Sequence, residues 1–103
     1  MKYSINISIN TYIKDDDEIM DAADELLEIV QQGFLLEIHT YSEMSVSLDN
    51  EENSIIIFNI SEIEKEDLDG AIAAAREVVA IIKEEFLINF PGSEIISVFP
   101  PIN

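Results

Sequence analysis

The sequence contains no cysteine, no tryptophan and only one histidine. Without cysteine the chain has neither a disulfide framework nor a thiolate metal site. Its three glycines, Gly33, Gly70 and Gly92, lie too far apart to form a glycine-rich phosphate-binding loop. No recognisable motif ties a serine to His39, so a catalytic triad has no support. We therefore expect no catalytic residue, no bound metal and no cofactor, and we predict that the protein is not an enzyme.

Basic residues are also scarce, because 5 Lys and Arg accompany 22 Asp and Glu and leave a formal net charge of −17. Contacts to nucleic-acid phosphates need Lys and Arg, and an anionic membrane surface repels an acidic protein. We therefore expect neither direct nucleic-acid binding nor membrane binding. No stretch approaches the roughly 20 apolar residues of a membrane span, and the first residues alternate in polarity, unlike a signal peptide. These absences favour a cytoplasmic protein.

Hydrophobic residues are abundant, at 48% of the 103 positions. Disordered chains combine high charge with low hydrophobicity, so this composition favours a folded protein despite its charge. A chain of this length buries roughly 60–70% of its unfolded surface, which suffices for a core without disulfides. We therefore expect residues 1–103 to form a single domain.

The spacing of apolar residues predicts an alternation of strands and helices. Apolar and polar residues alternate with a period of two in the segments expected to be strands, and recur every three or four positions in the expected helices. Gly33 stands where the first helix is expected to stop, and Ser61 with Glu64 matches a capping box that would begin the second. The expected elements are a strand over 3–13, a helix over about 16–32, a strand over 34–48, a strand over 54–60, a helix over about 62–87 and a strand over 94–99.

The order strand–helix–strand–strand–helix–strand predicts an α+β fold of the ferredoxin-like βαββαβ type. Right-handed crossovers place both helices on one face of a four-stranded antiparallel sheet, which makes a two-layer sandwich. The segments over 3–13 and 54–60 are expected to be the central strands, and Pro100 with Pro101 ends the last strand. Since this fold supports many unrelated functions, it says almost nothing about the function of the chain.

The first expected helix carries acidic residues along one face. They recur at intervals of three and four positions, and residues four apart are separated by about 6 Å along a helix axis. Phosphates along a nucleic-acid strand have a comparable spacing, so such a column imitates a phosphate backbone for a basic partner. The alternative is a solvated acidic surface, since the helix dipole explains acids in the first turn but not Glu25 and Glu28. The predicted partner-binding residues are Asp17, Asp21, Asp24, Glu25 and Glu28.

The sheet face away from the helices is the second candidate surface. If Ile56, Phe58 and Ile60 face the core, the residues between them are pushed outward. Exposed isoleucine beside tyrosine makes a mixed surface of the kind found at interfaces, with a second copy or with another partner. Two alternatives stay open: the C-terminal segment covers this face, or a β-bulge breaks the alternation. The candidate interface residues are Tyr12, Glu37, His39, Tyr41, Ile55 and Ile57.

In size and charge the chain is similar to phage-encoded anti-restriction and anti-CRISPR proteins, to uracil-DNA glycosylase inhibitors and to nuclease immunity proteins, although it shares no motif with them. This resemblance implies a DNA mimic: an acidic inhibitor, phage-encoded and acting in the host cytoplasm, that binds and blocks a basic nucleic-acid-handling protein. The alternative is a homodimeric ferredoxin-like assembly module whose acidity only keeps it soluble. A third class, an enzyme or a small-ligand sensor, has no residue pattern that favours it.

Overall fold

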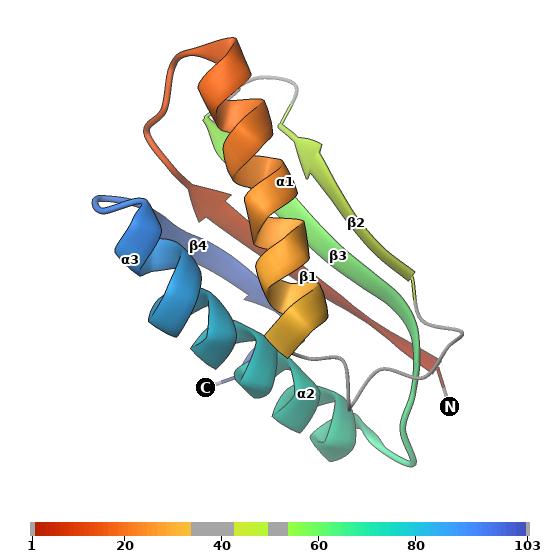
Figure 1. Cartoon of the computed structure of the whole chain (residues 1–103). Helices are drawn as coiled ribbons and strands as arrows, with labels where there is room; N and C mark the ends of the chain where they lie inside the picture. The colour runs from red at the N-terminus through yellow and green to blue at the C-terminus, as the bar shows by residue number, and fades with distance from the viewer. Residues whose placement is uncertain (1, 34–42, 50–53, 103) are drawn as a thin grey trace.

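The computed structural model describes residues 2–33, 43–49 and 54–102. The strand predicted over 34–48 is therefore described only in part, because residues 34–42 lie outside these ranges. The second helix continues through a π-helical segment, η1, into a short terminal helix (Figure 1). In chain order the elements are β1 (Lys2–Asn10), α1 (Asp16–Gly33), β2 (Glu43–Leu48), β3 (Ile55–Glu64), α2 (Leu68–Ile81), η1 (Ile82–Phe86), α3 (Leu87–Asn89) and β4 (Glu94–Phe99).

The strands form one antiparallel sheet in the order β2-β3-β1-β4, so β1 and β3 are central as predicted. Figure 1 shows α1 and α2 lying across the same face of this sheet. This arrangement confirms the predicted ferredoxin-like α+β sandwich. The opposite face of the sheet carries no helix in the part of the chain that the structure describes, so the molecule has one helical side and one sheet side.

Alternation along the central strands gives the sheet its buried side. Ile5, Ile7 and Ile9 of β1 are fully buried, and each lies opposite a buried residue of β3. Burial of a large apolar side chain contributes about 1.5–3 kcal/mol, so this layer contributes strongly to the stability of the sandwich. The β3 partners are the residues predicted to face the core: Ile56, Phe58 and Ile60. The helices contribute Ile19, Ala22, Ala23, Leu26 and Val30 from α1, Ala71, Ala74, Ala75, Val78 and Val79 from α2, and Ile82 and Phe86 from η1.

β1 ends at Asn10, before the predicted end of the strand at residue 13. The Thr11 N–H still donates to the Ser54 carbonyl at 2.9 Å, and side chains take over after it: Asn10 Oδ1 accepts from the Tyr12 N–H at 3.0 Å, and Thr11 Oγ1 accepts from the Ile13 N–H at 3.2 Å. Tyr12 adopts a φ of 59°, in the left-handed region that strands do not use. Asn and Thr compete with regular structure through such local hydrogen bonds, which the alternation of polarity does not reveal.

The predicted capping box at Ser61 and Glu64 is wrong, because both residues lie inside β3. The strand continues past the predicted end at residue 60 through a β-bulge, in which Glu62 adopts a φ of 59°. The bulge shifts the alternation by one residue and leaves Ile63 buried. In the sequence, one extra residue in a period-two pattern looks like the end of a strand, and this is why the prediction placed the helix too early.

The second helical segment begins at Leu68 instead of near residue 62 and ends at Asn89, slightly beyond the predicted end at 87. Its cap is Asp67, whose Oδ1 accepts a hydrogen bond from the Gly70 N–H at 2.9 Å. A cap of this kind contributes about 1 kcal/mol. The true start signal is therefore an aspartate, six residues after the serine that the sequence pattern favoured.

α1 has the predicted bounds to within one residue and ends at Gly33, where a stop was expected. The reason for glycine is a close approach of two helices. A Cβ atom on Gly33 would lie 3.1 Å from side-chain carbons of Ile81, at the end of α2. A contact this short would force Ile81 to move, so the absent side chain lets α1 pack tightly against α2.

Candidate functional site

α1 starts with a side-chain cap that fixes its first turn. Asp15 Oδ1 accepts hydrogen bonds from the N–H groups of Asp17 and Glu18, both at 3.0 Å. The helix dipole favours acids in this turn, by about 0.3–1 kcal/mol each. Farther along the helix, Ile19 and Leu26 are buried and mark the side of α1 that packs against the core. The opposite side of the helix therefore faces solvent.

The solvent side of α1 carries exposed carboxylates, which we call the acidic column. Its members are Asp17, Asp21, Asp24 and Glu28. Successive members are four, three and four positions apart, so they lie on one side of the helix. From the first member to the last, the helix axis rises about 16 Å. The structure therefore aligns four of the five acids predicted to bind a partner.

Glu25, the fifth predicted acid, is only partly exposed and lies beside the acidic column. Its Oε1 accepts a hydrogen bond from Asn89 Nδ2 of α3 at 3.2 Å. This contact joins α1 to the end of the second helical segment. Glu25 therefore has a role in holding the helices together, and we do not count it in the acidic column.

The acidic column has little internal compensation. Within residues 2–33, 43–49 and 54–102, the carboxylates of Asp17, Asp21 and Asp24 make no hydrogen bond or ion pair. Glu28 accepts a hydrogen bond from Gln32 Nε2 at 3.3 Å, within the same helix. α1 itself contains no Lys or Arg. Since like charges three or four positions apart destabilise a helix by about 0.2–0.5 kcal/mol per pair, the column costs stability where it stands.

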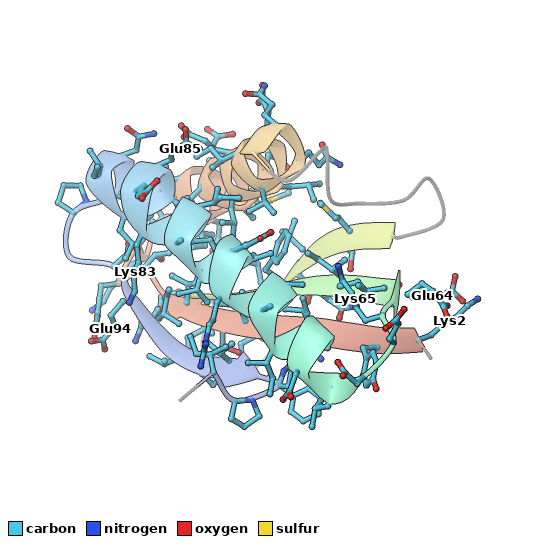
Figure 2. The ribbon with its side chains drawn as sticks, turned by 90° about the horizontal axis from the view of Figure 1, so that it is seen from below. Lys2, Glu64, Lys65, Lys83, Glu85 and Glu94 are labelled. Carbon is cyan, nitrogen blue, oxygen red and sulfur yellow. The ribbon has the colours of Figure 1, made fainter. Side chains whose placement is uncertain are left out.

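The basic residues Lys2, Arg76 and Lys83 lie on elements other than α1. Arg76 of α2 donates from Nε and Nη2 to the Ile102 carbonyl, at 3.2 and 2.9 Å, and so ties down the C-terminal segment. Lys83 of η1 and Glu94 of β4 both line one hollow, and Figure 2 shows them at the opposite end of the molecule from Lys2. Lys2 is placed by strand pairing opposite Glu64, at the far end of the sheet. The acidic column therefore has no basic residue on its own helix, and exposed Lys14, two positions before the start of α1, is the nearest basic residue along the chain.

Met20 is an apolar side chain beside the acidic column that the sequence pattern did not single out. It is 59% exposed, three positions after Asp17 and four before Asp24, so it neighbours both on the helix surface. Methionine is enriched at protein interfaces, where its flexible side chain adapts to a partner. The sequence does contain this information, because Met20 is an apolar residue that falls outside the three-to-four spacing of the buried residues of its helix.

The sheet side of the molecule is defined by strand pairing, since residues paired across neighbouring strands share a face. We call this surface the open face. Its described members are Ser4, Asn6, Ser8 and Asn10 of β1, Ser45 and Ser47 of β2, Ile55, Ile57 and Asn59 of β3, and Ile96, Ser97 and Phe99 of β4. All of these side chains are uncharged. The same face also carries charged residues at its two ends: Glu94, paired with Asn10, at one, and Lys2, paired with Glu64, at the other.

The structure places three of the predicted interface residues and leaves three undescribed. Ile55 and Ile57 lie partly exposed on the open face, and Tyr12 is 58% exposed just beyond its edge. The other three predicted residues lie outside the described residues: Glu37, His39 and Tyr41.

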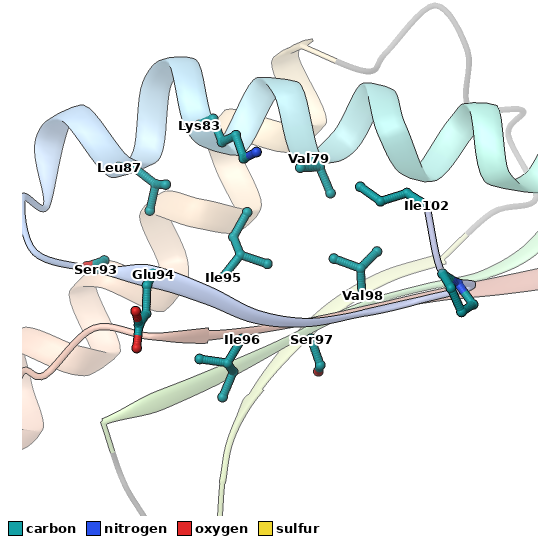
Figure 3. Close-up of a pocket in the computed structure, with 11 residues that line it drawn as sticks. Val79, Lys83, Leu87, Ser93, Glu94, Ile95, Ile96, Ser97, Val98 and Ile102 are labelled. Carbon is teal, nitrogen blue, oxygen red and sulfur yellow. The ribbon is translucent and has the colours of Figure 1, made fainter.

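As far as Ile102, the last described residue, the C-terminal segment does not cover the open face. Figure 3 shows Ile102 on the helical side of β4, whereas Ile96 and Ser97 point the opposite way. A β-bulge does interrupt β4, because Ile96 is the extra residue between two pairs of the β1–β4 ladder. This bulge adds Ile96, 47% exposed, and Phe99, 59% exposed, to the open face. A strict alternation that starts with Ile95 on the core side would place Phe99 on the core side as well. The sequence does not reveal the bulge, because Ile95 and Ile96 are identical neighbours.

Tyr12 reaches from beyond β1 to the end of β4. Its hydroxyl donates a hydrogen bond to Glu94 Oε1 at 2.5 Å. This hydrogen bond holds the proton on the phenol and, with desolvation and the negative charge of Glu94, raises the pKa of Tyr12 above its usual 10.0. The contact links the residue that follows β1 to the edge strand of the sheet, which the sequence pattern alone did not suggest.

A hollow of about 480 Å³ opens between β4 and the second helical segment (Figure 3). Its walls are mainly apolar, with Val79, Leu87, Ile95 and Val98 among the lining residues, and the amino group of Lys83 is the basic group among them.

No cluster of three His, Asp or Glu that could hold a metal exists among the described residues. None of the helices that the structure describes is long and apolar enough to span a membrane.

The sequence matches no protein-family model and no curated protein. Among solved structures, the chain is similar to the solution NMR structure of a de novo designed protein with a ferredoxin fold, with a TM-score of 0.56, 10% identity, and coverage of 100% of this chain and 88% of that one. The crystal structure of AtUAH in complex with glyoxylate gives a TM-score of 0.44 and 13% identity, over 94% of this chain and 27% of that one. The similarity to the designed protein supports the ferredoxin-like fold and extends no further.

Proposed function

We propose that this protein is a small acidic inhibitor that binds a basic nucleic-acid-handling protein through the acidic column and blocks its groove. The observation that carries the proposal is the alignment of Asp17, Asp21, Asp24 and Glu28 on an exposed helix face that has no Lys or Arg. Such a protein is a binding protein and not an enzyme. It belongs in function with anti-CRISPR, anti-restriction and nuclease-immunity proteins, and would be phage-encoded and act in the host cytoplasm.

The spacing of the acidic column supports imitation of nucleic acid. A DNA strand carries one phosphate per about 3.4 Å of helix axis, so about 16 Å of axis holds about five phosphates. The column places four carboxylates along the same length. A groove that binds phosphates with Lys and Arg would therefore meet a similar density of negative charge on α1.

The cost of the acidic column also supports a partner. Neighbouring like charges oppose each other, and Glu28 lies near the C-terminal end of α1, where the helix dipole disfavours an acid. A basic groove removes this repulsion on binding and is drawn in by the long-range field of the whole chain. Electrostatic attraction raises the association rate and the specificity more than the affinity. Met20, exposed at the centre of the same surface, offers an apolar contact that would add affinity.

The test uses a variant that removes part of the acidic column and a matched control that removes equal charge elsewhere. The column variant combines Asp21→Asn, Asp24→Asn and Glu28→Gln. The control combines exposed acids near and on α2: Glu66→Gln, Asp69→Asn and Glu77→Gln. Each tagged protein is incubated with host lysate at low salt, bound proteins are eluted by raising the salt, and the eluates are compared by mass spectrometry.

We expect the wild-type and control chains to retain the same basic nucleic-acid enzymes, and the column variant to lose them. Affinity for a purified target should fall steeply as salt is added, and duplex DNA should compete for binding. If both variants retain the same proteins, or if binding does not depend on salt, the acidic column is not the binding surface and the proposal is wrong.

A further inference from the structure

The open face is the neutral region of a strongly acidic molecule. Asp and Glu occupy 22 of the 103 positions, yet the described centre of this surface, around Asn6, Ser8 and Asn59, carries none, and Glu94 and Glu64 stand only at its ends. The side chains at its centre are small and polar: Asn6, Ser8 and Asn59. The centre of this surface is therefore a place where a second acidic chain meets little negative charge.

Apolar side chains lie on both flanks of this polar centre. Ile55 and Ile57 lie on β3, while Ile96 and Phe99 lie on β4, with β1 between the two groups. Phe99 is 59% exposed, and this is a high exposure for an aromatic ring on a sheet surface. Interface centres are depleted of charged residues, and the centre of the open face shares this feature, with Phe99 as an exposed aromatic side chain on its flank.

We propose that the open face binds the open face of a second copy of this chain, forming a two-fold symmetric dimer. A two-fold interface must be complementary to itself. Ser and Asn side chains both donate and accept hydrogen bonds, so a surface of Ser and Asn pairs with an identical surface, whereas carboxylates only accept. The open face meets this condition, and the acidic column would repel its own copy.

The charge distribution selects the same geometry. Two chains of net charge −17 repel each other at every approach. Contact through the two sheets keeps the α1 helices on opposite outer sides of the dimer, where their acids are farthest apart (Figure 1). The dimer then displays two acidic columns outward. This inference rests on the open face alone and stands whether or not the acidic column binds a target.

The size of the surface predicts a weak dimer. Four strands about 4.8 Å apart and about six residues long at 3.3 Å each give a face of roughly 20 by 20 Å. Two such faces cover roughly 800 Å² before side-chain relief is counted, whereas specific complexes bury about 1,200–2,000 Å². We therefore expect an equilibrium between monomer and dimer that shifts with protein concentration.

Salt distinguishes this interaction from binding to a basic target, because the two respond in opposite directions. Screening weakens attraction to a basic groove but also weakens the repulsion between two acidic chains. Sedimentation equilibrium of the full chain at about 0.01 M and about 1 M salt should show the dimer dissociation constant falling by about tenfold or more as salt rises. A dimer weakened by salt would be held by charged contacts and would overturn the proposal, as would a monomer at both salt concentrations and at the highest protein concentration.

Two variants locate the contact. Asn6→Asp adds a charge at the centre of the open face without changing shape, and the dimer carries it twice. Gln31→Glu adds the same charge at the exposed end of α1 and serves as the control. We expect Asn6→Asp to weaken dimerisation at least about tenfold at low salt and Gln31→Glu to leave it nearly unchanged. Equal effects of the two variants would place the contact elsewhere and refute the proposal.

Phe99→Ser tests the apolar part of the same surface. Because the ring is mostly exposed in the monomer, its removal should weaken the dimer while leaving the unfolding curve of the dilute monomer in place. A dimer of unchanged affinity in this variant would contradict the assignment of the interface to the open face. Circular dichroism of each variant checks that the fold is retained.

Discussion

The outward side of α1 and the open face of the sheet lie on opposite sides of one core and differ chiefly in charge. The first displays four exposed carboxylates in a line, and the second displays Ser, Asn, Ile and Phe side chains, with charged residues only at its described ends. A net charge of −17 suggests an acidic coat over the whole molecule. The comparison shows instead that the charge is distributed unevenly between the two surfaces.

The two-layer fold makes this separation available. A helix and a strand each bury one side against the shared core and leave the other side free to vary. In α1 the free side recurs every three to four residues, and in β1 and β3 every second residue. The acidic column and the open face are therefore built from residues that contribute little to the core, and the chain can change one surface without changing the other.

The largest effect is expected from comparing the two sides of β3. Phe58 is fully buried, whereas its neighbour Ile57 lies partly exposed on the open face. Phe58→Ala should destabilise the protein by about 3–5 kcal/mol, because it removes buried area and leaves a cavity. Ile57→Ser should cost less than about 1 kcal/mol in the monomer.

Urea unfolding followed by circular dichroism, at a protein concentration too low for association, measures both changes. The informative quantity is the ratio of the two changes in the free energy of unfolding. It reports how strongly a side chain of the open face stabilises the monomer, relative to a side chain of the core. If Ile57→Ser costs as much as Phe58→Ala, then Ile57 is part of the core and the open face is not a free surface.

The sequence sufficed to predict the fold because its strongest patterns are local. The alternation in β1 and the helical spacing of Ile19, Ala22, Leu26 and Val30 are each set by one buried side. Element boundaries were harder to predict because they depend on single hydrogen bonds. β1 ends where Asn10 and Thr11 accept from the backbone, and α2 starts at the Asp67 cap, while Ser61 resembled a cap that is not used.

The candidate surfaces were also predictable to different degrees, because local spacing can be read from a sequence whereas contacts between distant residues cannot. The acidic column follows from spacing within one helix. The contact between Glu25 and Asn89 joins residues 64 positions apart, and no local pattern contains it. On the open face, the bulge at Ile96 brings two adjacent residues to one side. Sequence periodicity therefore found the surfaces but missed Met20, Ile96 and Phe99.

A smaller effect should separate the acidic column from acids elsewhere. In the Asp21→Asn, Asp24→Asn, Glu28→Gln variant, several like-charge neighbours are removed, each worth about 0.2–0.5 kcal/mol. We expect this variant to be about 1 kcal/mol more stable than the wild-type chain at low salt. The gain should shrink at about 1 M salt, where the Debye length is about 3 Å. Thermal unfolding at the two salt concentrations measures it.

The α2 variant with Glu66→Gln, Asp69→Asn and Glu77→Gln is the matched control, since it removes the same charge from exposed positions. Asp69 stands in the first turn of α2, where the helix dipole favours an acid. Its neutralisation should offset any relief from lower net charge, so the control should gain little or lose stability. Equal gains in both variants would mean that total charge, and not the column, sets the cost.

The smallest effect concerns the hydrogen bond at the border of the open face, where Tyr12 donates to Glu94. This bond raises the pKa of Tyr12 above 10.0 in the folded state. Folding therefore favours the protonated phenol, and the stabilisation is fully present below the unfolded-state pKa of about 10 and is lost as pH rises through the higher folded value. Near-UV absorbance titration of the wild-type chain, with Tyr12→Phe identifying the contribution of this residue, should show Tyr12 ionising later than a free tyrosine.

Glu94→Ala should bring the pKa of Tyr12 back toward 10.0, because the alanine removes both the acceptor and the charge. Glu77→Ala removes one exposed carboxylate from α2 and should leave the titration of Tyr12 unchanged. If both variants shift Tyr12 equally, the general acidic field controls its ionisation. In that case the negative potential of the acidic side extends to the border of the open face, and the separation of the two surfaces is less complete than the positions of their side chains indicate.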